Sequence, residues 1–123
     1  MSKLTNCLLN KDQSCVPVWF MRQAGRYLPE FRKIRSQNKN FINLCLNSSL
    51  SSEITLQPLK RFNLDAAIIF SDILMVPFSL GQTVTFKKNE GPHLSLFNLE
   101  NFLDNNKINF TQKLNSVYEA IKI

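Results

Sequence analysis

The sequence predicts an α/β fold built on a parallel crossover, in which one strand leads through a helix to a second strand. Two apolar runs predict the strands: residues 16–21, VPVWFM, and residues 66–70, AAIIF. Both are continuously apolar rather than alternating, which is typical of strands covered on both faces in parallel sheets. Between them, apolar residues recur at roughly helical spacing from Leu50 to Phe62, so we expect a helix there. Strand, helix and strand is the order of a right-handed crossover.

A long connection, residues 22–47, separates the first predicted strand from this helix. Connections of about 2 to 6 residues are usual at such a place. Within the long connection, the patterns of residues 27–35 and 41–46 predict short helical turns. Because long loops at strand ends often carry function, this segment is a candidate for the functional site.

A β-hairpin is expected after the second strand. Residues 83–86, TVTF, alternate in the way of a strand, and residues 88–91, KNEG, form a turn signal. Gly81 fits a tight bend before the hairpin. These features add a small antiparallel element to the crossover.

The C-terminal segment predicts a helix that begins at Thr111, an acceptable N-cap residue. Its apolar stripe runs from Leu114 to Ile121, and no stop signal follows before Ile123. We interpret residues 1–123 as a fragment of a longer single domain, since the helix has no stop signal and two crossover units alone would leave a sheet edge and a sheet face uncovered.

Composition indicates part or all of one globular domain, with 44% hydrophobic and 20% charged residues among 123. No apolar stretch approaches the roughly 20 residues of a membrane span, and no signal-like segment follows the N-terminus. We therefore expect a cytoplasmic protein with no membrane partner. The three cysteines lack the close spacing of a zinc or redox site, so reduced structural thiols are expected and no metal site.

The net charge of +6 is concentrated near the N-terminus. Residues 1–40 hold eight Lys and Arg against two acidic residues, whereas the two signs balance in the rest of the chain. Four of the five basic residues between positions 22 and 35 are arginines. A surface for duplex DNA would normally spread lysines along a face, so a compact anionic ligand is favoured over a nucleic acid.

The ends of the two predicted strands carry the polar residues of most interest. In a parallel crossover both strands end on the same side of the sheet, which places Arg22 and Arg26 beside Asp72. Arginines offer fixed donors that match carboxylates. Ala24 and Gly25 keep the backbone approachable, and Asp72 suits a cation or a cluster of N–H donors. The residues alone leave other interpretations open: the arginines could lie in a solvated loop, and Asp72 could cap a following turn.

Three segments carry a family resemblance: PVWFMRQAGRYLPEFRKIR, EITLQPLKRFNLDAAIIFSDIL and GQTVTFKKNEGP. From Pro17 to Pro92 the chain resembles the N-terminal third of the uroporphyrinogen decarboxylases, cytoplasmic enzymes of haem and porphyrin biosynthesis. The resemblance implies a (β/α)8 TIM barrel, usually a homodimer, that removes CO2 from the four acetates of uroporphyrinogen to give coproporphyrinogen without a metal or organic cofactor. The chain would be an incomplete barrel of about two βα units, a long first loop and a hairpin.

The resemblance also implies a set of site residues. The substrate-binding residues would be Arg22, Gln23, Ala24, Gly25, Arg26, Arg35 and Asp72. Asp72 would also be catalytic: its carboxylate would face the pyrrole N–H groups and stabilise the positive charge that develops when a pyrrole carbon is protonated. Contacts that the family takes from later strands have no positions here, so the 123-residue chain alone is expected to be inactive.

Other functions remain open at this stage. A truncated chain could bind porphyrinogens without turnover, and a basic chain could bind nucleic acid. Corrinoid methyltransferases resemble the same fold, but they typically use a zinc site with His and Cys ligands. No His-x-Cys spacing occurs in this sequence.

Overall fold

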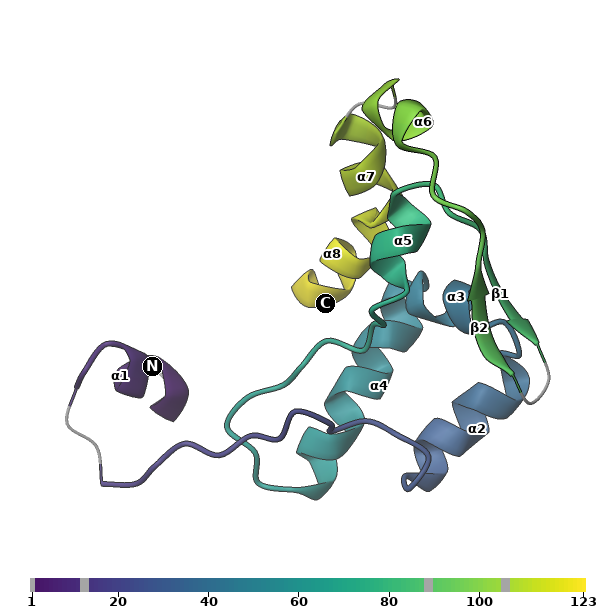
Figure 1. Ribbon diagram of the computed structural model, residues 1–123. Helices are drawn as coiled ribbons and strands as arrows, with labels where there is room; N and C mark the ends of the chain where they lie inside the picture. The colour runs from purple at the N-terminus through teal and green to yellow at the C-terminus, as the bar shows by residue number, and fades with distance from the viewer. Residues whose placement is uncertain (1, 12–13, 88–89, 105–106) are drawn as a thin grey trace.

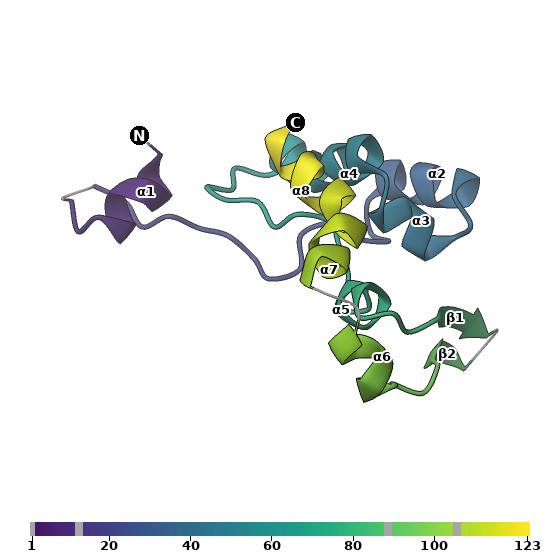
Figure 2. The same cartoon turned by 90° about the horizontal axis from the view of Figure 1, so that it is seen from above.

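The computed structural model describes residues 2–11, 14–87, 90–104 and 107–123, and combines helices with one small sheet (Figure 1). The elements in chain order are α1 Lys3–Leu8, α2 Pro29–Gln37, α3 Phe41–Cys45, α4 Ser48–Arg61, α5 Met75–Ser79, β1 Val84–Lys87, β2 Gly91–Leu94, α6 Leu99–Asp104, α7 Lys107–Lys113 and α8 Asn115–Lys122. Seen from above, α1 stands at one end of the molecule and the hairpin at the other (Figure 2). Helices α4 and α8 lie between them, and α2 lies at the same end as the hairpin.

The predicted crossover helix is confirmed as α4, the longest helix described. It begins after Asn47, whose side chain accepts a hydrogen bond of 2.9 Å from the N–H of Leu50. This bond satisfies one of the donors that a helix start leaves unpaired. The helical turns predicted in the long connection are confirmed as α2 and α3, and α2 starts with Pro29, which suits a first helical turn.

The two predicted strands, residues 16–21 and 66–70, are not strands in this structure. Neither belongs to a sheet, although the two segments lie side by side. Asp65 joins them by donating its N–H to the carbonyl of Val18 and accepting the Val18 N–H on Oδ2. Further along, Gln23 reaches Ala66 and Ile68, so both segments run in the same direction. A parallel pair is less stable than an antiparallel one and normally needs further strands and covered faces.

The one sheet within the described residues is the predicted hairpin. Strands β1 and β2 pair antiparallel, with Val84 opposite Leu94 and Lys87 opposite Gly91. Part of the predicted turn, residues 88–89, lies outside the described residues. Gly81 has φ +95°, which confirms the tight bend expected before the hairpin.

Two apolar clusters form the core. The first gathers Leu28, Phe31, Ile34, Leu44 and Ile54 between α2 and α4. The second gathers Ile42, Cys45, Met75 and Leu114. Phe70 belongs to the rim of both clusters, with ring centroids 5.6 Å from Phe31 and 6.0 Å from Phe41. The second predicted strand therefore contributes to packing although it forms no ladder.

The C-terminal helix is divided in two. Thr111 lies inside α7 rather than at a helix start, and the chain turns at Leu114 before α8 begins, so the predicted N-cap at Thr111 is wrong. Leu114 is buried in the second cluster and α8 packs along α4 (Figure 1). Only part of the predicted apolar stripe is buried, because Leu114 enters the core while Ile121 stays exposed.

Candidate substrate-binding site

The loop that follows the first extended segment, residues 22–27, is held by hydrogen bonds within the N-terminal half of the chain. The N–H of Leu28 donates to the carbonyl of Gly25 at 3.0 Å, and the hydroxyl of Tyr27 donates to the carbonyl of Gln23. From α2, Arg32 Nη1 donates to the carbonyls of Arg26 at 2.8 Å and Tyr27 at 3.3 Å. These bonds give the loop a defined shape without using the side chains of Arg22 or Arg26.

Arg22 and Arg26 are both exposed, and neither guanidinium bonds to a described residue. Ala24 is half-buried against the first cluster. At Gly25 an added Cβ would lie 3.6 Å from Tyr27, an ordinary contact, so packing within the described residues does not demand glycine there. The loop therefore presents two cations that pair with no described residue on a fixed backbone, an arrangement suited to an anionic ligand.

Gln23 occupies a different position from the arginines beside it. It is only 5% exposed, and its amide joins the two extended segments. Nε2 donates to the carbonyl of Ala66 at 2.8 Å, while Oε1 accepts the N–H of Ile68 at 3.1 Å. These two bonds of the side-chain amide take the place of backbone hydrogen bonds that would connect the segments in a sheet. Gln23 is thus a positioning residue in this structure, a role that the sequence did not suggest.

Arg35 is held at the C-terminal end of α2. Its Nη1 donates to the carbonyls of Asn38 and Lys39, the latter at 2.8 Å. Its guanidinium carbon lies 5.7 Å from the centre of the Phe41 ring, within the range of a cation–π contact. Arg35 therefore has part of its donor set committed to the backbone.

Asp72 follows the second extended segment and is half-buried. Its Oδ1 accepts the N–H of Leu74 at 2.9 Å, and its backbone carbonyl accepts the N–H of Met75 at 3.0 Å. The capping role considered for this residue is therefore present. No described residue donates a hydrogen bond to Oδ2, so the carboxylate retains acceptor capacity.

The charges of Asp72 and Arg35 both affect the pKa of the Cys45 thiol. Burial is the main cause that raises the pKa of the Cys45 thiol to about 12; the negative charge of Asp72 contributes to this increase, and the positive charge of Arg35 opposes it. The thiol is therefore neutral at physiological pH and packs as a small apolar group. This confirms the structural role expected for Cys45.

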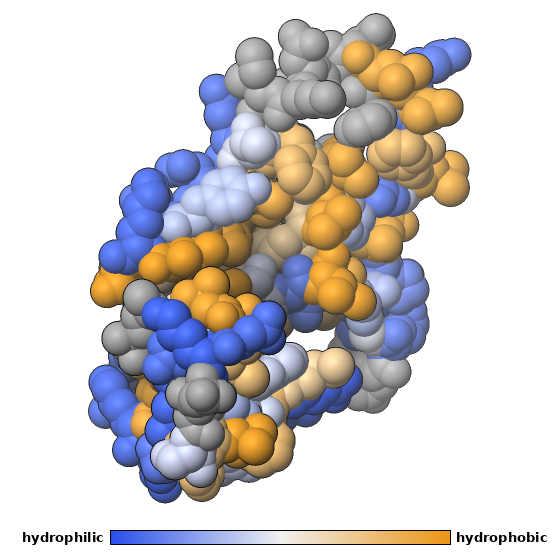
Figure 3. Space-filling view, turned by 90° about the vertical axis from the view of Figure 1, so that its left-hand side faces the viewer, coloured by the Kyte–Doolittle hydropathy of each residue, from blue (hydrophilic) through white to orange (hydrophobic). Residues whose placement is uncertain are grey.

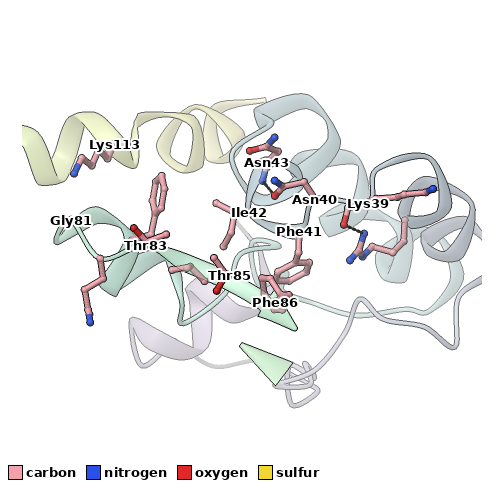
Figure 4. A pocket seen from close by; sticks show the side chains of 14 residues that line it. Lys39, Asn40, Phe41, Ile42, Asn43, Gly81, Thr83, Thr85, Phe86 and Lys113 are labelled. Atoms are coloured by element: carbon pink, nitrogen blue, oxygen red, sulfur yellow. Dashed lines mark hydrogen bonds between the residues drawn. The ribbon is translucent and has the colours of Figure 1, made fainter. Parts of the chain in front are cut away.

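A cavity of about 720 Å³ lies between α3 and β1 (Figure 4). Its lining contains three cations, no acidic residue and three phenylalanines; the cations are Arg35, Lys39 and Lys113. Among the residues predicted for the substrate site, Arg35 alone lines this cavity. Lys39 could have been inferred from the basic excess of residues 1–40, but Lys113 is distant in sequence and only the tertiary fold brings it to the cavity.

The described residues form neither a metal site nor a membrane-spanning helix. They contain no group of three His, Cys, Asp or Glu side chains placed to hold a metal ion. None of their helices combines the length and the apolarity required to cross a membrane.

The described residues form a protein of mixed helix and strand, in which two extended segments run in the same direction and are followed by arginines and by an aspartate. The chain belongs to the uroporphyrinogen decarboxylase family, whose sequence model matches residues 1–123. The family is a TIM barrel and a family of carboxy-lyases. This agrees with the resemblance drawn from the sequence and with the interpretation of the chain as an N-terminal portion of that fold.

Curated relatives support the same assignment. The chain is 50% identical over 122 residues to the uroporphyrinogen decarboxylase of Rickettsia rickettsii (strain Sheila Smith), a match that covers 99% of this chain and 35% of that protein. It is 49% identical over 114 residues to the Rickettsia felis enzyme, covering 93% of this chain and 33% of that protein. The Rickettsia canadensis enzyme is 48% identical over 122 residues, with 99% and 36% covered. The chain thus spans about a third of the length of these relatives.

Proposed function

We propose that this chain supplies the N-terminal, substrate-binding part of a uroporphyrinogen decarboxylase, which converts uroporphyrinogen to coproporphyrinogen by four acetate decarboxylations. The proposal rests on Arg22 and Arg26, which bond to no described residue and lie on a loop held beside the segment that leads to Asp72. Uroporphyrinogen is a polycarboxylate with pyrrole N–H groups, so it requires both cations and an anionic acceptor.

The arginines bind and orient the substrate in this proposal. Each charge-assisted hydrogen bond contributes about 1.5–3 kcal/mol, which corresponds to about 10- to 150-fold in affinity per bond. Two arginines that engage acetate or propionate groups would therefore hold a macrocycle against the loop. Arg35 would add a third positive charge, although part of its donor set is occupied by backbone carbonyls.

Asp72 stabilises charge in the reaction. Protonation of a pyrrole carbon makes the ring an electron sink, so that the adjacent acetate can lose CO2. A carboxylate that faces the ring N–H groups lowers the energy of this cationic intermediate because it is already oriented before the charge develops. The bond from Leu74 to Oδ1 holds the carboxylate in place, and Oδ2 remains available to accept from the substrate.

Substitutions of Asp72 test this role in a chimera that joins residues 1–123 to the part of the Rickettsia rickettsii enzyme beyond the matched region. Asp72→Asn keeps an oxygen that can accept from Leu74, so the fold should remain while the negative charge is lost. We expect turnover to fall by about 100- to 1,000-fold, the usual effect of removing one preorganised electrostatic group. Glu53→Gln, at an exposed position of α4, is the matched control and should leave turnover unchanged. Full turnover of the Asp72→Asn chimera would exclude the proposed role.

Substitutions of the arginines test substrate binding in the same chimera. Arg22→Met and Arg26→Met should each raise KM by about 10-fold or more, from the loss of a charge-assisted bond. Lys33→Met removes an exposed charge from α2 and should change KM little. An equal effect of all three substitutions would indicate general electrostatic attraction rather than a site. Binding of uroporphyrinogen without turnover would support a binding function alone.

We also propose the oligomeric state, the cofactor requirement and the cellular location of the whole protein. The family resemblance implies a homodimer that works without a metal or organic cofactor in the cytoplasm. Light scattering on the purified chimera, together with turnover after treatment with a chelator, would test the first two of these expectations.

A further inference from the structure

Helix α4 carries two buried hydroxyl groups that bond to the backbone of the second extended segment. Ser51 Oγ donates a hydrogen bond to the carbonyl of Phe70 at 2.5 Å, and Thr55 Oγ1 accepts the N–H of Phe70 at 2.7 Å. Ser51 is fully buried and Thr55 is 7% exposed. The two side chains therefore satisfy both backbone groups of Phe70, which a neighbouring strand would satisfy in a sheet.

The hydroxyl of Thr55 is held in one orientation. It donates its single hydrogen to the carbonyl of Ser51 at 2.7 Å, so the oxygen can only accept from the N–H of Phe70. Together with the bond from Ser51 to the carbonyl of Phe70, these bonds close a ring that ties one turn of α4 to one residue of the second segment. We call these three hydrogen bonds the α4 clamp.

The α4 clamp gives the second segment a direction that apolar packing does not provide. Burial of apolar groups is non-directional, and such groups also reach the surface over much of the face seen in Figure 3. Ile68, in the middle of the second segment, is 40% exposed. Hydrogen bonds, in contrast, weaken steeply when their distance or angle changes. The clamp therefore fixes the position and the rotation of Phe70 relative to α4.

Phe70 lies two residues before Asp72, the residue proposed to stabilise charge in the reaction. The bond from the N–H of Leu74 orients the Asp72 carboxylate, but it cannot fix the turn relative to the rest of the chain because Leu74 belongs to the same turn. The α4 clamp supplies this second restraint close to Asp72. We propose that Ser51 and Thr55 are positioning residues that act through Phe70 to hold Asp72 in place. The proposal rests on the function proposed above.

Amide hydrogen exchange of the 123-residue chain, measured for each residue by NMR, tests the α4 clamp without any need for activity. Thr55→Val keeps the size and branching of the side chain but removes the hydroxyl. We expect the exchange rate of the Phe70 N–H to rise by about 10-fold, and that of the Leu74 N–H, which bonds to Asp72 Oδ1, by about threefold. Thr55→Ser keeps the hydroxyl and should return both rates to within about twofold of the wild-type values.

Ser52→Ala is the matched control because Ser52 is 5% exposed on the same helix and, among the described residues, makes no hydrogen bond to the second segment. It should leave both exchange rates unchanged. The amides of α2 are the internal reference: an equal rise there would show a general loss of stability and overturn the positioning role. If Thr55→Val does not fold, Ser51→Ala removes the bond to the Phe70 carbonyl, leaves the Phe70 N–H bonded and should raise the rates at Phe70 and Leu74 by about threefold.

Turnover by the chimera described above separates positioning from general packing. Thr55→Val should lower kcat by about 10- to 100-fold and change KM by less than about twofold, because the substrate is bound by the arginines while Asp72 acts on the charge that develops in the reaction. In a chimera that already carries Asp72→Asn, Thr55→Val should lower kcat by no more than about a further twofold, since a residue that acts through Asp72 has little effect once its charge is absent. Thr55→Ser should restore kcat, and Ser52→Ala should leave it unchanged.

The outcomes separate this proposal from the proposed function. The same fold-loss of kcat from Thr55→Val with and without the Asp72 charge, or an equal loss from Ser52→Ala, overturns the positioning role. An active chimera in which Thr55→Val accelerates neither amide and leaves kcat unchanged rejects only the positioning role. A wild-type chimera without turnover rejects the decarboxylase function, and the exchange rates of Phe70 and Leu74 then decide by themselves whether the α4 clamp holds Asp72 in place.

Discussion

Replacement of Gln23 by methionine tests whether a single side-chain amide holds the two extended segments together. Gln23 makes two hydrogen bonds, to the carbonyl of Ala66 and from the N–H of Ile68, and it is 5% exposed. Methionine has a similar size but offers neither bond. With a net contribution of about 0.5–1.5 kcal/mol for each bond, Gln23→Met should lower the free energy of unfolding by about 1–3 kcal/mol. Gln37→Met, at an exposed position on α2, is the control and should change it by less than about 0.5 kcal/mol.

Urea unfolding followed by two probes provides the assay. Circular dichroism reports on the helices, and the fluorescence of Trp19, the only tryptophan, reports on the first extended segment. Because Trp19 lies four residues before Gln23, its transition should move to lower urea in the variant at least as far as the helical transition does. If Gln23→Met and Gln37→Met unfold at the same urea concentration by both probes, the amide does not join the segments and the reasoning fails.

Three further predictions concern packing, acid stability and thiol reactivity. Ile54→Ala should cost about 2–5 kcal/mol in urea unfolding because Ile54 is fully buried in the first cluster, whereas Leu56→Ala on the exposed side of the same helix should cost much less. The N–H of Val18 and the ammonium of Lys3 hold the pKa of Asp65 below its ordinary value of 3.8. The ionised carboxylate therefore stabilises the fold above pH 3.8, and this stabilisation is lost as the pH falls through the lower pKa of the folded state. Asp65→Asn should reduce the acid dependence of the melting temperature, and an unchanged pH profile would contradict this. Since the pKa of Cys45 is about 12, iodoacetamide at pH 8 should label the two exposed cysteines of the folded chain and reach Cys45 only in denaturant, as mass spectrometry would show.

The local elements followed from the sequence because their causes are local. The apolar spacing of α4, the helical turns of the long connection and the alternation of the hairpin each depend on residues a few positions apart. The segment around Arg22 and Arg26 that carries the family resemblance was likewise recognisable from the sequence. These predictions needed no knowledge of distant contacts.

The sequence missed features that depend on neighbours remote along the chain. It could not show that Gln23 would turn inward to join Ala66 and Ile68 while the arginines on either side stay exposed. It could not place Lys113 beside the cavity at α3 and β1. Each of these positions depends on which segments pack together after the chain has folded.

The two apolar runs show which features follow from the local sequence and which depend on contacts between distant segments. The sequence by itself determined that residues 16–21 and 66–70 would be extended and apolar, since β-branched and aromatic side chains favour that backbone. Only the tertiary structure decided whether they would form a sheet, because strand pairing is set by the partners available on each side of a segment. Here α4 and Gln23 satisfy one side of the second segment, and the other side remains unpaired among the described residues.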